Sequence, residues 1–187
     1  LDGTDINGNM VNETDVTDNN GAYLFDNLWP GTYKLTFATP PGGYVPTTAN
    51  DPDANPNDSD DSDADPTMGV MTVIETLTSG ENNDDFDAGY FAPVQVGDYV
   101  WLDKNANGVQ DAGEAGIENV EVKLLDGAGN PVTTDANGNT IVNQFTNASG
   151  YYLFDNLIPG VYKVMFINPD ATKYTLKRVK AGQNTIS

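Results

Sequence analysis

A twelve-residue stretch from Asp103 to Glu114, with the sequence DKNANGVQDAGE, carries oxygen-bearing side chains at the spacing of an EF-hand calcium loop. Calcium takes about six to eight oxygen ligands, and such a loop supplies them from positions 1, 3, 5, 7, 9 and 12. Gly108 stands at position 6, where the chain must turn sharply. The spacing predicts a calcium site made of Asp103, Asn105, Asn107, the main-chain carbonyl of Val109, Asp111 and Glu114.

The sequences on either side of this loop predict strands instead of the helices of an EF-hand. Residues 96–102 are rich in valine and aromatic residues, and Val120, Val122 and Leu124 alternate with charged residues. Gln110 also departs from the apolar residue usual at position 8 of paired EF-hands. A calcium sensor opens a pair of helices, so this mechanism is excluded and a clamp between two strands remains. The alternative is an Asn/Asp/Gly turn that binds no ion.

A second, weaker candidate for calcium lies in an acidic stretch at residues 51–65, which holds seven aspartates. Such a run is ordinarily solvated and disordered, but a cation could offset the repulsion and order it. The candidate ligands are Asp58, Asp60, Asp61, Asp63 and Asp65. A third string, from Asp135 to Asn139, has no acid at the closing position, and we predict a hairpin turn there.

Composition excludes several classes of function. The formal net charge is −20, and there is neither cysteine nor histidine, so zinc sites, thiol nucleophiles and histidine acid–base chemistry have no residues to use. Of the 28 acidic residues 22 are aspartate, which turns and calcium loops favour, although adaptation to high salt is an alternative explanation. The charge makes nucleic acid an unsuitable partner, and no apolar run has the length of a membrane span.

An internal repeat sets the organisation of the chain. Residues 20–33 (NGAYLFDNLWPGTY) return at 149–162 (SGYYLFDNLIPGVY), an offset of 129 residues. A weaker match of Leu1-Asp2-Gly3 to Leu125-Asp126-Gly127 at an offset of 124 predicts about five extra residues in the second copy, near residues 140–143. In each copy a strand of alternating apolar residues follows, which predicts half-buried antiparallel sheets.

The copies predict two domains, 1–93 and 94–187, that meet at Ala92-Pro93-Val94. Shifted by the repeat offset, the counterpart of the loop falls before Leu1, and the counterpart of residues 87–90 falls beyond Ser187. We therefore expect the first domain to lack an opening strand and calcium loop within this sequence, and the second to lack a closing strand.

Blocks along nearly the whole chain resemble the calcium-binding B repeats of serine-aspartate-repeat surface adhesins, which are related to collagen-adhesin B-type domains. These blocks are VGDYVWLDKNANGVQDAGEAGIENVEVKLLD, SGYYLFDNLIPGVYKVMF, and GGYVPTTAND with SDADP and ENNDDFDAGYF. The resemblance implies an all-β fold of tandem immunoglobulin-like or prealbumin-like β-sandwiches with calcium-binding loops. It also implies an extracellular location on a cell surface, and Ca²⁺ that rigidifies a stalk. It supports a calcium role for the first ligand set, and less securely for the aspartates around SDADP.

Three functions remain open, and none is enzymatic, because no carboxylate pair lies in an apolar context that would separate two pKa values. The first is a structural, calcium-rigidified stalk or fibre module. The second is a self-assembling filament subunit completed by strands of neighbouring chains. The third is an adhesin or carbohydrate-binding module with Trp29 or Trp101 as its platform. The expected partners are neighbouring copies of the same domain or chain. No lysine is placed to form an isopeptide bond.

Overall fold

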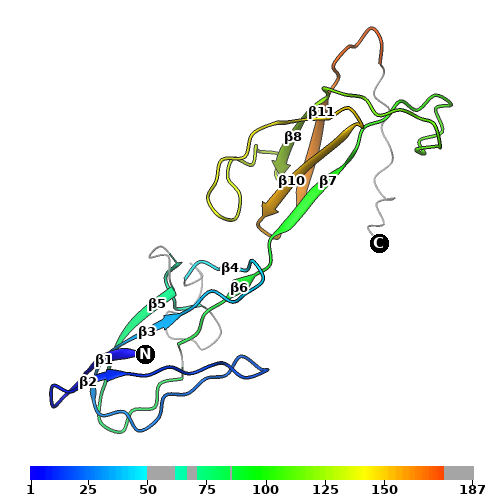
Figure 1. Cartoon of the computed structure of the whole chain (residues 1–187). Coiled ribbons are helices and arrows are strands. Elements are labelled where there is room, and N and C mark those ends of the chain that lie inside the picture. The colour runs from blue at the N-terminus through cyan, green and yellow to red at the C-terminus, as the bar shows by residue number, and fades with distance from the viewer. Residues whose placement is uncertain (50–61, 67–70, 85, 175–187) are drawn as a thin grey trace. The chain divides into compact units, whose positions relative to one another are not determined.

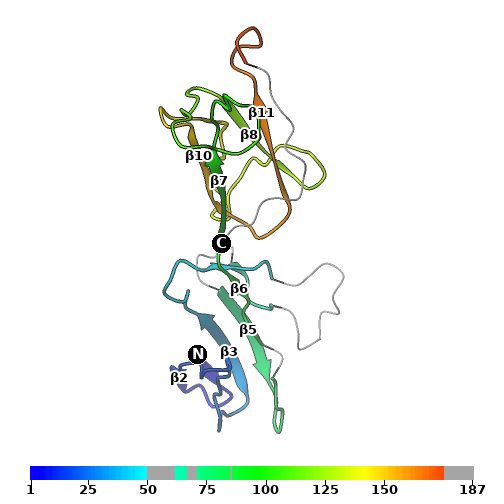
Figure 2. The same ribbon diagram turned by 90° about the vertical axis from the view of Figure 1, so that its right-hand side faces the viewer.

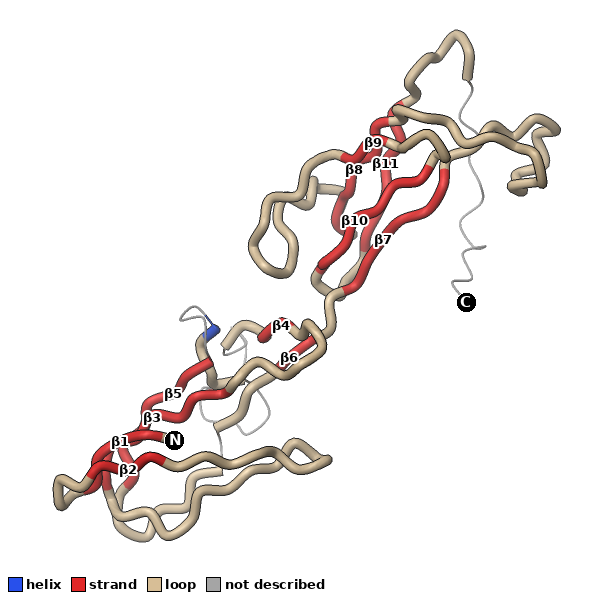
Figure 3. Tube along the Cα trace, in the orientation of Figure 1, coloured by secondary structure: helices blue, strands red, loops and turns tan. Residues whose placement is uncertain are grey.

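The computed structural model describes residues 1–49, 62–66, 71–84 and 86–174, and its contacts divide the chain into two compact units, Leu1–Ala92 and Pro93–Ser187. In these described ranges the regular elements are β-strands, apart from a 3₁₀ turn at Pro66 (Figure 3). The predicted all-β class is confirmed. No helix among the described residues is long and apolar enough to cross a membrane.

The second unit is a β-sandwich of two small antiparallel sheets (Figure 1). One sheet pairs β7 (Val94–Tyr99) with β10 (Tyr151–Leu157). In the other, β8 (Glu121–Asp126) lies between β9 (Gln144–Phe145) and β11 (Tyr162–Ile167). Alternate residues of a strand point to opposite faces, so each sheet can bury one face against the other.

The core of this unit lies between its two sheets. Val122 and Leu124 of β8 pack with Tyr152, Phe154 and Leu157 of β10, and each of the five is at most 7% exposed. The intervening residues of β8 are only half-buried, as the alternation predicted. Burying these side chains supplies the main driving force for folding of the unit.

The first unit contains a four-stranded sheet in the order β2-β1-β3-β5 and a two-stranded pair of β4 with β6 (Figure 3). Figure 2 shows β3 beside β5 in this sheet. The strands are β1 (Asp2–Asp5), β2 (Met10–Asn12), β3 (Gly31–Phe37), β4 (Val45–Pro46), β5 (Met71–Leu77) and β6 (Tyr90–Phe91). Tyr33 and Leu35 of β3 are buried, at 3% and 8% exposure, which agrees with the predicted apolar face of this strand.

A turn of one geometry occurs in both units. The N–H of Asp5 donates to the carbonyl of Asn9 at 3.0 Å, and Asp126 N–H donates to the Asn130 carbonyl at 2.9 Å. In each turn the aspartate carboxylate also accepts from the asparagine side chain. The hairpin turn at Asp135 in the second unit makes the same two contacts, so turn geometry alone does not fix the offset between the units.

The third acidic string forms the hairpin turn that its sequence predicted. Asp135 N–H donates to the Asn139 carbonyl at 2.9 Å, and Thr134 and Thr140 form an antiparallel bridge across the turn. Gly138 has a φ of +79°, a conformation that glycine adopts without strain. The Asp135 carboxylate accepts the side-chain amide of Asn139 and also backbone N–H groups of the turn, and these hydrogen bonds lower its pKa.

Candidate calcium site

Contacts between extended segments close the loop Asp103–Glu114 at both ends. Trp101 forms an antiparallel bridge with Gly116, and the N–H of Leu102 donates to the Ala115 carbonyl at 2.9 Å. Two β-strands, β7 and β8, flank the loop in the sequence. The loop is therefore a connection between strands that is pinned at its base, as the flanking sequences predicted.

The first half of the loop folds around the carboxylate of Asp103. This carboxylate accepts the backbone N–H of Asn107 at 3.1 Å and that of Gly108 at 2.9 Å. Gly108 has a φ of +80°, so the sharp turn predicted at position 6 is present. The backbone of the loop thus folds around the carboxylate of the first predicted ligand.

The second half brings the remaining side-chain ligands into the same network. One oxygen of Asp111 accepts the side-chain amides of Asn105 at 2.7 Å and Asn107 at 2.8 Å. The carboxylate of Glu114 accepts the backbone N–H of Lys104 at 2.8 Å and that of Asp111 at 3.1 Å. All five predicted side-chain ligands are linked within one loop.

A cation in this loop would need oxygen ligands from the whole loop, because the carboxylates alone do not form a site. Among the described residues, no group of three or more acidic side chains is gathered closely enough to hold a metal ion. The loop offers two asparagine amides and the Val109 carbonyl beside its three carboxylates, and calcium accepts all of these oxygen types. The three acidic side chains are half-buried, while Asn105 and Asn107 are exposed.

The second candidate set divides at the edge of the described structure. Asp58, Asp60 and Asp61 lie outside the described residues. Asp63 lies beside Asp87, with its N–H donating to the Asp87 carbonyl and its carboxylate accepting the Asp87 N–H, both at 3.2 Å. The described part of the acidic stretch therefore lies beside residues 87–89. Sequence reasoning missed Asp87 as its neighbour, although the DDFDAGY block that contains it was part of the resemblance.

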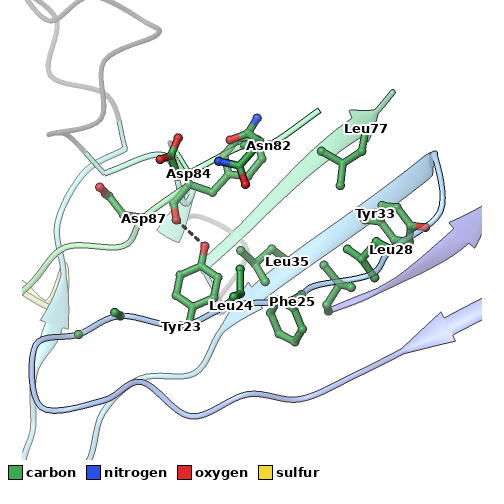
Figure 4. Close-up of a pocket in the computed structure, with 15 residues that line it drawn as sticks. Tyr23, Leu24, Phe25, Leu28, Tyr33, Leu35, Leu77, Asn82, Asp84 and Asp87 are labelled. Atoms are coloured by element: carbon green, nitrogen blue, oxygen red, sulfur yellow. Dashed lines mark hydrogen bonds between the residues drawn. The ribbon is translucent and has the colours of Figure 1, made fainter. Parts of the chain in front are cut away.

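Tyr23 joins this acidic corner of the first unit. Its hydroxyl donates to the carbonyl of Phe86 (Figure 4). Burial, together with the nearby charges of Asp87 and Asp63, raises the pKa of Tyr23 to about 12. The phenol therefore stays neutral at ordinary pH and serves as a hydrogen-bond donor.

The two tryptophans differ in their suitability as a binding platform. Trp101 is half-buried, and its indole nitrogen is buried without a hydrogen-bond partner among the described residues. It lies at the base of the candidate loop, next to its bridge with Gly116. Trp29 is 64% exposed, and its backbone carbonyl accepts the Tyr33 hydroxyl at 2.6 Å. Of the two predicted platforms Trp29 is the more exposed.

Comparison with protein families finds the same match in both halves of the chain. The family model of the SdrD B-like domain matches residues 2–90 and again residues 94–187. The two matches coincide with the two compact units and with the internal repeat.

Similar proteins occur in Staphylococcus aureus. Serine-aspartate repeat-containing protein C of strain N315 is 40% identical over 167 residues, which are 88% of this chain and 15% of that protein. The protein of the same name from strain Newman is 39% identical over the same shares. The chain therefore spans a small part of the length of these relatives.

Proposed function

The chain belongs to the family of SdrD B-like domains, and we propose that it is a calcium-stabilised structural module of a stalk or fibre. Domains of this family are structural, non-enzymatic parts of extracellular surface adhesins. The expected cell-surface location and non-enzymatic class are therefore confirmed. Calcium binding is general among B repeats of this kind. The ion, its ligands and its mechanical role in this chain are our proposal.

One observation carries the calcium proposal. The five predicted side-chain ligands form one hydrogen-bonded loop whose base is pinned by the Trp101–Gly116 bridge. The asparagine amides donate to Asp111, so they occupy the place where a cation would satisfy its charge. When calcium binds, rotation of these amides would turn their oxygens inward. This rotation would release the backbone N–H groups of Asn107 and Val109, which now donate to the two asparagine oxygens.

The proposed consequence is mechanical. An ion that binds only the folded loop stabilises it by about 2.7 kcal/mol at a hundredfold excess over its dissociation constant. The loop is fixed between strands, so this energy stiffens the unit and exposes no new surface, in contrast to a sensor. Such a module suits a stalk, where repeated units must keep their shape.

Thermal unfolding of the whole chain with calcium and with excess EDTA tests the proposal. The variant Trp29→Phe leaves Trp101 as the only tryptophan, so its fluorescence follows the second unit. We expect the chelator to lower the melting temperature of this unit by several degrees. An identical melting curve in calcium and in EDTA would overturn the proposal.

A matched pair of substitutions tests the ligand set. Asp111→Asn removes one carboxylate from the loop, whereas Asp135→Asn makes the same change in the hairpin turn of the same unit. We expect Asp111→Asn to weaken calcium binding by about tenfold or more, since ligand charge sets the affinity of such loops. Asp135→Asn should leave it unchanged. Equal affinities in isothermal titration calorimetry would place the ion elsewhere.

A further inference from the structure

The segment that leaves the candidate calcium loop is held on two sides. Residues 115–120 connect Glu114, the last predicted ligand, to β8. On one side, the N–H of Ile117 donates to the carbonyl of Val100 at 2.9 Å, which continues the pinned base of the loop. This side belongs to the part of the chain that enters the loop. The other side belongs to residues that are distant from the loop in the sequence.

On this other side one buried hydroxyl group fixes the segment. Thr146 follows β9 directly and is only 2% exposed. Its Oγ1 donates to the carbonyl of Ile117 at 2.7 Å and accepts the N–H of Val120 at 2.9 Å. The backbone of Thr146 adds two hydrogen bonds, from its N–H to the Val120 carbonyl at 3.1 Å and from the Asn119 N–H to its own carbonyl at 2.9 Å. A hydroxyl can donate and accept at once, so this single group closes the turn 117–120.

The turn that follows Thr146 is in direct contact with the backbone of the segment. A Cβ at Gly116 would lie only 2.1 Å from the carbonyl oxygen of Ser149, so the two backbones leave no room for a side chain. The side-chain oxygen of Asn147 holds this turn, because it accepts the N–H of Ser149 at 3.0 Å and its hydroxyl at 2.7 Å. Residues 146–149 therefore set the place of the segment, although they supply no predicted ligand.

The place of this segment bears on the last predicted ligand. The residue at position 12 of such a loop supplies two carboxylate oxygens to calcium. Here that residue is Glu114, whose carboxylate accepts the N–H of Asp111 at 3.1 Å. Glu114 stands two residues before Gly116, so the segment positions its backbone together with the loop itself. A site whose ligand lies about 1 Å out of place binds poorly, and the residues that support a ligand therefore affect its affinity.

We propose that Thr146 is a positioning residue of the calcium site, an inference that rests on the proposed calcium function. Its hydroxyl keeps the turn 117–120 closed, and the closed turn holds Glu114 where both of its carboxylate oxygens reach the ion. Without the hydroxyl, the Ile117 carbonyl and the Val120 N–H lose their partner, and the turn opens to satisfy them with water. Because coupling between sites is reciprocal, bound calcium in turn keeps this turn closed.

Two substitutions at one position test this role in the whole chain. Thr146→Val removes the hydroxyl and keeps the branched shape of the side chain, whereas Thr146→Ser keeps the hydroxyl. Isothermal titration calorimetry follows the calcium-binding step that Asp111→Asn weakens. We expect Thr146→Val to weaken this step about tenfold, which lies in the usual range for coupling between two sites. Thr146→Ser should bind calcium like the parent chain.

A control variant separates positioning from a general loss of stability. Val164 of β11 packs against the core of the same unit, so Val164→Ala should lower the melting temperature and leave the calcium affinity of the folded chain unchanged. Amide hydrogen exchange adds a measurement on the unaltered chain. Calcium should slow exchange of the Val120 N–H, which donates to the Thr146 hydroxyl, and of the Asn119 N–H in the same turn.

Three results would overturn the role of Thr146. The first is equal calcium affinity of the parent chain and Thr146→Val, which would leave the proposed function intact. The second is an equal loss of affinity in Thr146→Val and Val164→Ala, since affinity would then follow overall stability. The third, which decides the matter if Thr146→Val does not fold, is exchange of the Val120 and Asn119 amides that calcium leaves unchanged. A parent chain whose loop binds no calcium would overturn the proposed function and the positioning role with it.

Discussion

The two units show how much of a β-sandwich depends on a single strand. In the second unit Tyr152, Phe154 and Leu157 are at most 7% exposed, because β7 covers one side of the core. Their counterparts in the first unit, Tyr23, Phe25 and Leu28, are only half-buried and line a cavity. Nearly identical local sequences thus reach different burial, and the difference comes from the partner strand.

The largest expected effect comes from truncating the equivalent aromatic residues. Phe154→Ala should destabilise the second unit by about 3–5 kcal/mol, the usual cost for a buried aromatic residue. Phe25→Ala should cost the first unit about half of that or less, because its ring is already partly solvated. Denaturant unfolding followed separately in each unit measures both. Equal losses would show that Phe25 is as well packed as Phe154.

Sequence patterns located the strands and the loop because those signals are local. Alternation in β3 and β8, the position of Gly108 and the hairpin at Asp135 follow from residue types within a few positions. The candidate calcium loop was found from its spacing, and in the structure its five side chains belong to one hydrogen-bond network. These features need no knowledge of distant residues.

The remaining features could not be predicted because strand pairing is not local. Residues 22–28 and 151–157 have almost the same sequence, so nothing within them distinguishes the paired from the unpaired state. The contact of Asp63 with Asp87 joins residues 24 positions apart.

A second comparison uses two equivalent glycines with the same backbone conformation. Gly150 has a φ of +84° and Gly21 a φ of +85°, so an alanine at either position costs about 1 kcal/mol or more in strain. A Cβ at Gly150 would also lie 2.1 Å from the Val100 carbonyl oxygen, whereas nothing lies within 4 Å of one at Gly21. Gly150→Ala should therefore be the more damaging change by at least about 1–3 kcal/mol.

Thermal unfolding of the two alanine variants measures this difference. Matching losses of melting temperature would mean that strain alone sets the cost and that the segment after β7 does not press on Gly150.

The prediction with the smallest effect at neutral pH concerns a tyrosine with a raised pKa in each unit. The pKa of Tyr23 and that of Tyr152 are each raised to about 12, chiefly by burial, from an ordinary value of 10. Folding therefore favours the neutral phenol, and this contribution to stability is complete below pH 10 and is lost as the pH rises from about 10 to about 12.

Tyr23→Phe should make the first unit less sensitive to pH in this range, and Tyr152→Phe should do the same for the second. Absorbance of the tyrosinate near 295 nm, recorded with unfolding curves at each pH, measures both. A Tyr23 that ionises near pH 10 would show that water reaches its hydroxyl through the open side of the first unit, and the comparison would then extend from packing to electrostatics.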